Sequence, residues 1–366
     1  MNVHRIVSLG VIGVTVLAAV YMGYNRSYSL SHESPVAENI RDARTGYQHY
    51  VAETHRVGIA EAARQVRENV ERGDTYTSTH CHYFMHAIGN AAVAMYPTLA
   101  GALAHGDDYC SYGYQHGVLQ VYSERTGLPE LMRTYTDVCD SEFAGYMNEK
   151  YSSCVHGLSH AVTNMLDLDY QKAIELCERY SLESARTNCI RAVFMEYTDV
   201  RSLSMNNPRF PEDPLFPCND VDSAYDKDCF QYTIYIPLVT NDHNYAATFE
   251  VCNGVRSDAA RHSCNRGLGR IAMSENWDNS GAIATAKCFE AQSREAQADC
   301  MGGVTSRMLT FNKSLTATYA HCETLPQQVV TQCKRDAYDY FLSKYCHEPE
   351  LANDPEGQQA CTSDFR

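Results

Sequence analysis

The chain has 366 residues, which is enough for one large or two ordinary domains with a substantial hydrophobic core. Its 45 acidic residues outnumber its 30 basic residues and give a formal net charge of −15. This balance argues against nucleic acid as a partner and against charge-driven docking on anionic lipid, because both require clustered lysine and arginine.

The N-terminal residues predict a membrane anchor or a signal peptide. Residues 6–24 form a largely apolar run that is long enough to span a bilayer, with Arg5 before it and Arg26 after it. Ala18 and Ala19 offer a small-residue cleavage point, so cleavage as a signal peptide is the alternative. The length of the run and the lack of a clear Ala-x-Ala motif favour an uncleaved anchor. In either case the rest of the chain is expected in the periplasm or at the cell surface.

Residues 27–75 are expected to form a polar juxtamembrane linker followed by scaffold helices. The pattern predicts helix over residues 36–72, in two segments that break near Gly58. Gly73 and Asp74 provide the signal that ends the second segment.

The sixteen cysteines predict disulfide bonds formed in an oxidising compartment. No Cys-x-x-Cys pair occurs, so the signatures of thioredoxin-like chemistry, zinc ribbons and c-type haem attachment are absent. From Cys110 onward a cysteine recurs every 33 to 44 residues, a period typical of helix-pair solenoids, and most of these are preceded by another cysteine 11 to 15 residues earlier. The repeat therefore predicts six pairs: Cys139 with Cys154, Cys177 with Cys189, Cys218 with Cys229, Cys252 with Cys264, Cys288 with Cys300, and Cys322 with Cys333. We expect Cys346 and Cys361 to close the C-terminus, which leaves Cys81 and Cys110 for each other.

Each short interval suits the end of one helix linked to the start of the next across a turn. Asn188, Ser263 and Asp299 directly precede such cysteines and are good N-cap residues, so we expect the second helix of each unit to begin at its cysteine. The predicted fold is therefore all-α, a disulfide-stapled helix-pair repeat array of solenoid type. The expected organisation is an anchor or signal peptide (1–26), linker and scaffold helices (27–75), histidine-rich repeats (76–200), a Pro-rich loop (201–217) and C-terminal disulfide-linked repeats (218–366).

Polar residues recur on one face of the second helices. The third residue after the cysteine is often small and the fourth is mostly apolar, which predicts a core face. The second and sixth residues after the cysteine include His156, His160, Arg266 and Arg270. Because equivalent positions of a solenoid line one surface, we expect a polar stripe with histidines at one end and arginines further along. Such a stripe is also a candidate surface for a protein or peptide partner.

Histidines between residues 79 and 160 have spacings typical of a metal site. His82 and His86, and likewise His156 and His160, are spaced i,i+4, which places both imidazoles of a pair on one helix face. His116 and His160 both lie six residues after a cysteine, so they occupy equivalent places on adjacent helices. With every cysteine paired, imidazole is the dominant candidate ligand, and it suits copper, zinc and iron. We predict that these five histidines hold a transition metal, copper first and zinc or iron next.

Two alternatives remain open. His82 and His86 are one residue out of phase with the other histidines, so their convergence requires a rotated first helix. If the histidines instead bond neighbouring turns, the array is a non-catalytic scaffold for a protein or peptide. His80 and His105 are outer candidates. No His-Glu-x-x-His, nucleophile or nucleotide motif occurs, so no catalytic residue is assigned.

Four arginines and several tyrosines have a second interpretation beside the structural one. Arg191, Arg266, Arg270 and Arg307 have the chemistry to bind an anionic ligand bidentately, but the abundance of acidic residues favours salt bridges. Tyr83, Tyr112 and Tyr114 lie beside the histidines and are expected to fill helix interfaces, with their hydroxyls reaching water.

The histidine runs resemble motifs of poorly characterised, secreted or membrane-anchored cysteine-rich proteins of microbes. They read C-H-x-x-x-H-x-x-G over Cys81–Gly89, C-x-x-G-x-x-H-G over Cys110–Gly117 and C-x-H-G-x-x-H over Cys154–His160. The resemblance covers about residues 79–165, and elsewhere only the cysteines. It implies an extracytoplasmic location and a histidine metal site, and no established activity. The repeat plan is also similar in architecture to disulfide-bearing Sel1-like solenoids, although their A-x-x-x-L-G-x-x-Y pattern is missing.

Overall fold

The computed structural model describes residues 35–106, 109–143, 149–202, 213–276, 280–346 and 354–363. The predicted anchor over residues 6–24 and its cleavage point lie outside these ranges. Among the helices of the described part, none combines the length and apolar character of a membrane span. The chain divides into two compact units, Met1–Gly46 and Tyr47–Arg366, and everything discussed from the cysteine repeats onward belongs to the second.

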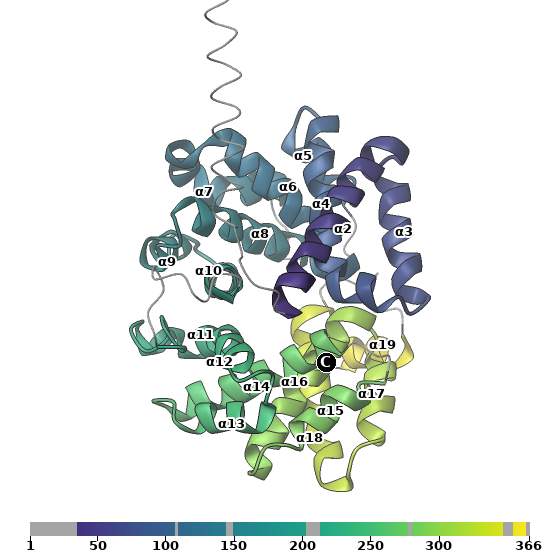
Figure 1. Ribbon diagram of the computed structural model, residues 1–366, viewed down its shortest axis with the longest axis vertical. Helices are drawn as coiled ribbons and strands as arrows, with labels where there is room; N and C mark the ends of the chain where they lie inside the picture. The colour runs from purple at the N-terminus through teal and green to yellow at the C-terminus, as the bar shows by residue number, and fades with distance from the viewer. Residues whose placement is uncertain are drawn as a thin grey trace, which may run out of the picture. The chain divides into compact units, whose positions relative to one another are not determined.

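The predicted all-α class is confirmed, because the described ranges contain helices and turns and no strand. The helices in chain order are α2 (Pro35–Val57), α3 (Ile59–Glu71), α4 (Thr75–Met95), α5 (Leu99–Leu103), α6 (Tyr109–Thr126), α7 (Leu128–Phe143), α8 (Glu149–Met165), α9 (Tyr170–Cys177), α10 (Glu183–Ser202), η1 (Ser223–Tyr225), α11 (Asp226–Thr233), α12 (Tyr235–Thr240), α13 (Tyr245–Asn253), α14 (Asp258–Glu275), α15 (Ala282–Cys288), α16 (Arg294–Asn312), α17 (Leu315–Glu323), α18 (Gln327–Lys344) and α19 (Pro355–Ser363) (Figure 1).

The first helices break where the sequence predicts. Gly58 separates α2 from α3 with φ of 88°, a positive value that residues with a Cβ atom rarely adopt. Gly73 takes φ of 81° just after α3. Asp74 then caps α4, because its side chain accepts a hydrogen bond from the Thr77 N–H.

All sixteen cysteines are paired, and all eight predicted pairs are confirmed. In most units the bond joins the C-terminal part of a short helix to the second turn of the long helix that follows. Bonds of this type are Cys139 to Cys154, Cys177 to Cys189, Cys252 to Cys264, Cys288 to Cys300, and Cys322 to Cys333.

Three bonds differ from this plan. The bond between Cys81 and Cys110 links α4 to the start of α6. The bond between Cys218 and Cys229 links an irregular segment to α11, and the bond between Cys346 and Cys361 links the segment after α18 to α19. The units at the two ends and in the middle of the array therefore depart from the repeat.

The expectation that each long helix begins at its cysteine is wrong. Cys189 lies inside α10 (Glu183–Ser202), Cys300 inside α16 (Arg294–Asn312) and Cys333 inside α18 (Gln327–Lys344), each one to two turns after the helix begins. The Cα atoms of a disulfide must lie within about 4.4–6.8 Å of each other. The two helices come this close at a point inside the second helix. For these three bonds the Cα–Cα distances are 5.4, 5.5 and 5.7 Å.

The caps of the long helices accordingly lie earlier in the chain than expected. Ser257 caps α14 by accepting from the Ala260 N–H, and Ser293 caps α16 in the same way. Ser263 and Asp299, which were expected to be caps, therefore lie inside their helices.

The core face is confirmed and explains the small residues. The fourth residues after the cysteines are fully or almost fully buried: Leu158, Val193, Leu268 and Val304. At the third position, a Cβ atom on Gly267 would overlap the carbonyl oxygen of Gln231, and one on Gly303 would overlap that of Arg266. Consecutive long helices thus approach to backbone contact, which only glycine allows at these points.

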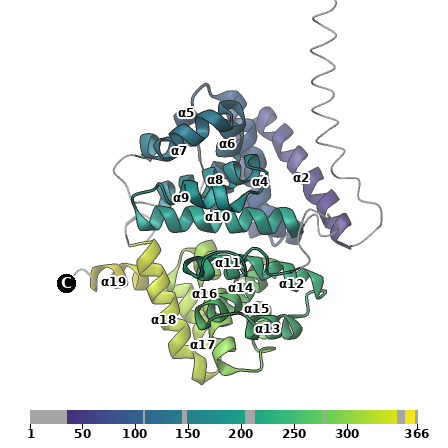
Figure 2. The ribbon, with the colours of Figure 1, turned by 90° about the vertical axis from the view of Figure 1, so that its left-hand side faces the viewer.

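The long helices pack in chain order, but the array turns back on itself. Figures 1 and 2 both show α4 to α10 grouped on one side of the second unit and α11 to α18 on the other. The two groups meet where α16 contacts α6: Arg307 Nη1 donates to Ser111 Oγ at 3.4 Å, and the Lys313 ammonium lies 5.8 Å from the Tyr112 ring centre. This contact places Arg307 next to the start of α6, the helix that carries His116.

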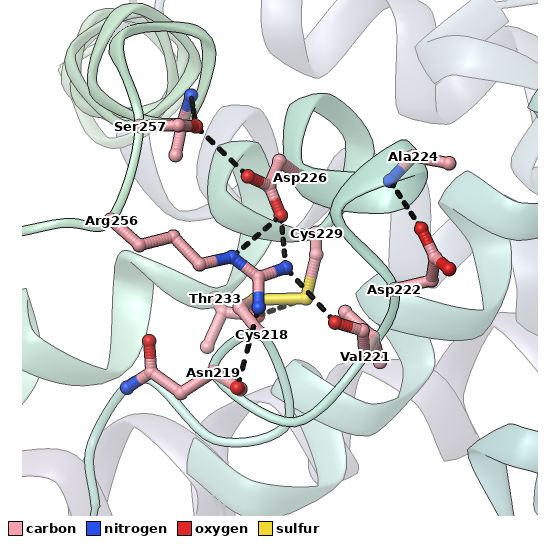
Figure 3. A network of polar contacts seen from close by, with 11 residues as sticks. Cys218, Asn219, Val221, Asp222, Ala224, Asp226, Cys229, Thr233, Arg256 and Ser257 are labelled. Carbon is pink, nitrogen blue, oxygen red and sulfur yellow. Dashed lines mark hydrogen bonds and ion pairs between the residues drawn. A yellow bond between two sulfur atoms is a disulfide. The ribbon is translucent and has the colours of Figure 1, made fainter.

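The repeat is irregular after the Pro-rich loop, of which only residues 213–217 are described. Turns replace the first helix there, and the second helix is interrupted at Ile234, before Pro237. A buried carboxylate holds this segment in place (Figure 3). Asp226 accepts from Arg256 through Oδ1 and from Ser257 through Oδ2, while Arg256 also donates to backbone carbonyls of the turn segment.

Candidate metal centre

The structure brings the five predicted histidines together. His82 and His86 come from α4, His116 from α6, and His156 and His160 from α8. The ring centre of His116 lies 5.1 Å from that of His82, 5.4 Å from His86, 5.3 Å from His156 and 5.6 Å from His160. His116 therefore sits between the two i,i+4 pairs. The ligand atoms of His82, His86 and His116 all lie within 4.8 Å of one another, a spacing that fits a single metal ion.

Glycines allow the three helices to come this close. A Cβ atom on Gly113 would overlap the carbonyl oxygen of His82, and one on Gly117 would overlap the carbonyl oxygen of His86. Gly157 of α8 faces the His116 ring in the same way, because a Cβ atom at this position would lie 2.6 Å from Cδ2 of His116. These glycines place three helix backbones in contact at the level of the imidazoles.

The phase offset of His82 and His86 has a local cause. Cys110, the partner of Cys81, is not in regular helix, because Cys110, Ser111 and Tyr112 take positive φ values of 55°, 59° and 62°. The disulfide bond of Cys81 in α4 therefore ends at a cysteine with non-helical backbone, whereas Cys154 and Cys189 lie within helices. His82 and His156 nevertheless occupy equivalent positions, because the Nδ1 atom of each bonds a backbone carbonyl of the next long helix. His82 bonds the Cys110 carbonyl at 2.8 Å, and His156 bonds the Asn188 carbonyl at 3.0 Å.

The hydrogen bonds of His156 and His160 orient their Nε2 atoms toward each other. A carbonyl oxygen only accepts, so His156 donates through Nδ1 to the Asn188 carbonyl. His160 Nδ1 lies 2.8 Å from a carboxylate oxygen of Glu196, which also accepts. The two Nε2 atoms are 3.2 Å apart, a separation at which two imidazole nitrogens can share one cation.

The other pair has a similar geometry. His82 donates through Nδ1, and its Nε2 lies 3.1 Å from Nε2 of His86. His116 is buried, and its Nδ1 has no hydrogen-bond partner in the described part of the chain. An unsatisfied buried nitrogen costs stability, about 1–3 kcal/mol, unless something binds it.

Burial keeps these rings neutral. It lowers the pKa of His82 to about 4 and, as the main cause, lowers the pKa values of His86 and His116 well below their ordinary range. The neighbouring histidines lower the pKa values of His86 and His116 further, because two imidazolium ions would repel. Neutral imidazole is the form that binds metals, so the site is ready to accept an ion at neutral pH.

The low pKa of His82 predicts how the metal-free protein responds to acid. The unfolded chain binds more protons than the folded one between the folded pKa of about 4 and the ordinary 6.5. The free energy of unfolding should therefore be highest above pH 6.5 and fall as the pH drops toward 4. Urea unfolding of metal-stripped protein across this range measures the slope. His82→Gln should reduce this slope by the amount that corresponds to roughly one proton taken up on unfolding. An unchanged slope would contradict the low pKa of His82.

Two acidic residues near the cluster were not singled out from the sequence. Glu196 on α10 holds His160 through Nδ1, an arrangement that commonly orients metal-binding histidines. Asp199 lies one turn further along α10, and its side chain is exposed. No motif marks either residue, because both depend on α10 packing beside α8.

The other candidates have structural roles or lie apart. His80 packs against Tyr76 and Phe84, and His105 stacks on Tyr96 with ring centres 4.3 Å apart. The isolated histidines pair with neighbours: His243 with Glu275, His262 with Asp299, and His321 with Thr285. The tyrosines beside the cluster serve packing, since Tyr114 donates to the Ala102 carbonyl and Tyr83 packs on Tyr47.

No protein-family model, curated protein or solved structure matches this chain. The resemblance to microbial cysteine-rich proteins and to Sel1-like solenoids therefore stays a prediction. The geometry itself establishes a cysteine-rich helical protein with eight disulfide bonds, which indicate an oxidising, extracytoplasmic environment.

Proposed function

We propose that this protein binds a transition metal outside the cytoplasm through His82, His86 and His116, with His156 and His160 completing the centre. The observation that carries the proposal is the pair of facing Nε2 atoms in His156 and His160, whose other nitrogens are both held by acceptors. The unsatisfied Nδ1 of buried His116 agrees with it, because a bound ion would satisfy that nitrogen.

The distances fit metal coordination. With metal–nitrogen bonds of about 2.0–2.1 Å, nitrogens 3.1 or 3.2 Å apart subtend an angle of about 100° at the ion. Two ligands of a tetrahedral or square-based site are separated by such an angle. Copper is our first choice and zinc or iron next, because an all-imidazole set suits these metals and copper binds most tightly among the divalent ions.

The group formed by His82, His86 and His116 would by itself leave a coordination position open. Catalytic zinc sites use three protein ligands in this way, with water or substrate in the fourth position. We therefore extend the proposal to a metalloenzyme, in which Glu196 orients His160. The competing proposal is a non-catalytic scaffold for a protein or peptide, with structural histidines.

Elemental analysis separates these proposals. The full chain, produced in an oxidising compartment without a histidine tag, should contain at least one copper, zinc or iron ion per chain. His156→Ala combined with His160→Ala should remove most of it. The matched control is His105→Ala combined with His243→Ala, which removes two histidines outside the cluster and should leave the metal content unchanged.

A wild-type protein that stays metal-free after incubation with each of these ions would contradict metal binding and favour the scaffold. Equal metal loss in the control pair would show that the ion is held non-specifically by surface histidines.

A further inference from the structure

Four arginines on the inner faces of the long helices were expected to pair with acids, and only two of them do. Arg191 pairs with Asp228 at 2.7 Å, and Arg266 lies 3.8 Å from Asp336. In the described part of the chain, Arg270 and Arg307 have no carboxylate within ion-pair distance. Two arginines without a carboxylate partner are unexpected in a protein with 45 acidic residues.

Neutral groups hold both guanidinium groups in place. Arg307 of α16 donates through Nε to Ser274 Oγ at 2.8 Å, and its carbon Cζ lies 4.5 Å from the centre of the Phe311 ring. Arg270 of α14 donates through Nη1 to Ser306 Oγ at 3.2 Å. Each arginine thus reaches across to a serine of the other helix. A guanidinium has five N–H donors, so most donors of both groups remain available for a ligand.

The two positive charges act on each other. Burial and the charge of Arg270 lower the pKa of Arg307 to about 10, so both side chains stay protonated at neutral pH. Like charges held together inside a protein are costly unless an opposite charge lies near them. Arg191 and Arg266 have that charge from aspartates, while Arg270 and Arg307 do not.

The arginine pair lies next to the histidine cluster. Arg307 Nη1 donates to Ser111 Oγ at 3.4 Å, and Ser111 follows Cys110, whose carbonyl accepts from His82 Nδ1. The charge of Arg307 is also close enough to contribute to the low pKa of His82. The turn of the array that joins α16 to α6 therefore places Arg307 beside His82, with Arg270 near Arg307.

We propose that Arg270 and Arg307 form a subsite for an oxyanion, the carboxylate or phosphate group of a small ligand. Their planar donor sets suit bidentate binding of such a group, and its negative charge replaces the missing aspartate. The idea that this ligand reaches the metal rests on the proposed function. The arginine subsite itself does not.

Anion binding to metal-stripped protein tests the subsite separately from the metal. Calorimetric titration with inorganic phosphate and with acetate, at constant ionic strength with chloride, should show saturable binding of at least one of them. Arg307→Gln and Arg270→Gln should each lower that affinity at least tenfold. Arg133→Gln is the control, because it removes an exposed arginine paired with Glu130 and should change nothing.

Thermal unfolding provides a second readout if one variant folds poorly. The anion should raise the melting temperature of wild type and of Arg133→Gln, and not that of Arg270→Gln. The proposal is overturned if wild type binds neither anion at millimolar concentration, or if the two arginine variants bind as tightly as wild type. If the protein binds an anion but takes up no metal ion in the elemental analysis, this inference stands and only the proposed function is contradicted.

Discussion

His116→Leu should abolish metal binding while leaving the metal-free protein at least as stable as wild type. His116 lies between the two histidine pairs, so its loss removes the residue that is near all four others. Losing a group that merely orients a ligand costs about 10–100-fold in metal affinity, so the loss of His116 should cost about 100-fold or more.

The stability part of this prediction follows from the unsatisfied Nδ1. Leucine is similar in size to histidine and removes a buried nitrogen that has no hydrogen-bond partner in the described structure. The unfolding free energy of the metal-free protein should stay constant or rise by about 1 kcal/mol. His116 would then lower the stability of the metal-free protein while being required for metal binding. Such a residue is retained for function and not for stability.

Competition titration against a metal-binding dye measures the affinity, and urea unfolding of metal-stripped protein measures the stability. The control is His321→Leu, which replaces another buried histidine, outside the cluster, and should leave metal affinity unchanged. A His116→Leu protein that is folded and binds metal as tightly as wild type would rule out His116 as a ligand.

Asp226→Ala should destabilise the protein by about 3 kcal/mol. Asp226 is 2% exposed and accepts from the Arg256 guanidinium and from Ser257 Oγ. Removing one partner of a buried pair leaves the other charge without compensation, which typically costs about 3–5 kcal/mol, and the partial exposure of Arg256 places the expected loss at the lower end. The change also removes the partner of Ser257, the residue that caps α14.

Urea unfolding with the disulfides intact measures this effect. Glu130→Ala is the matched control, because Glu130 forms an exposed pair with Arg133 and its loss should cost far less stability than the loss of Asp226. If Asp226→Ala costs no more than the control, the network in Figure 3 does not stabilise the segment between Cys218 and Cys229.

Periodicity and spacing predict a large part of this protein from the sequence. The regular intervals between cysteines yield six of the disulfide pairs, because a short loop allows few partners, and the remaining four cysteines then pair at the two ends of the array. The break at Gly58 follows from the same kind of local rule. The i,i+4 spacing within each histidine pair is enough to place both of its imidazoles on one helix face.

The helix starts were wrong because a cap depends on which side chain reaches the free N–H groups of the first turn. Ser257 does so for α14, and the sequence offers Ser263 as an equally good residue type. The disulfide bonds have a separate requirement. Each cysteine lies where two helices come close together, and that point is inside the second helix for Cys189, Cys300 and Cys333.

Glu196 and Asp199 were missed because their role depends on a neighbouring helix. Glu196 reaches His160 only because α10 lies beside α8, and the same packing brings Asp199 toward His160. Neither effect is visible in the residues next to them in the chain.

Local sequence therefore determines the helices, the disulfide pairs and the paired imidazoles, since most of these depend on residues at most a few turns apart. Only the tertiary structure decides that His116 lies between the two pairs, because this needs the backbone contacts that Gly113, Gly117 and Gly157 allow. It also decides that the array turns back so that Arg307 reaches Ser111, 196 residues away. No repeat period specifies how sharply successive helix pairs turn.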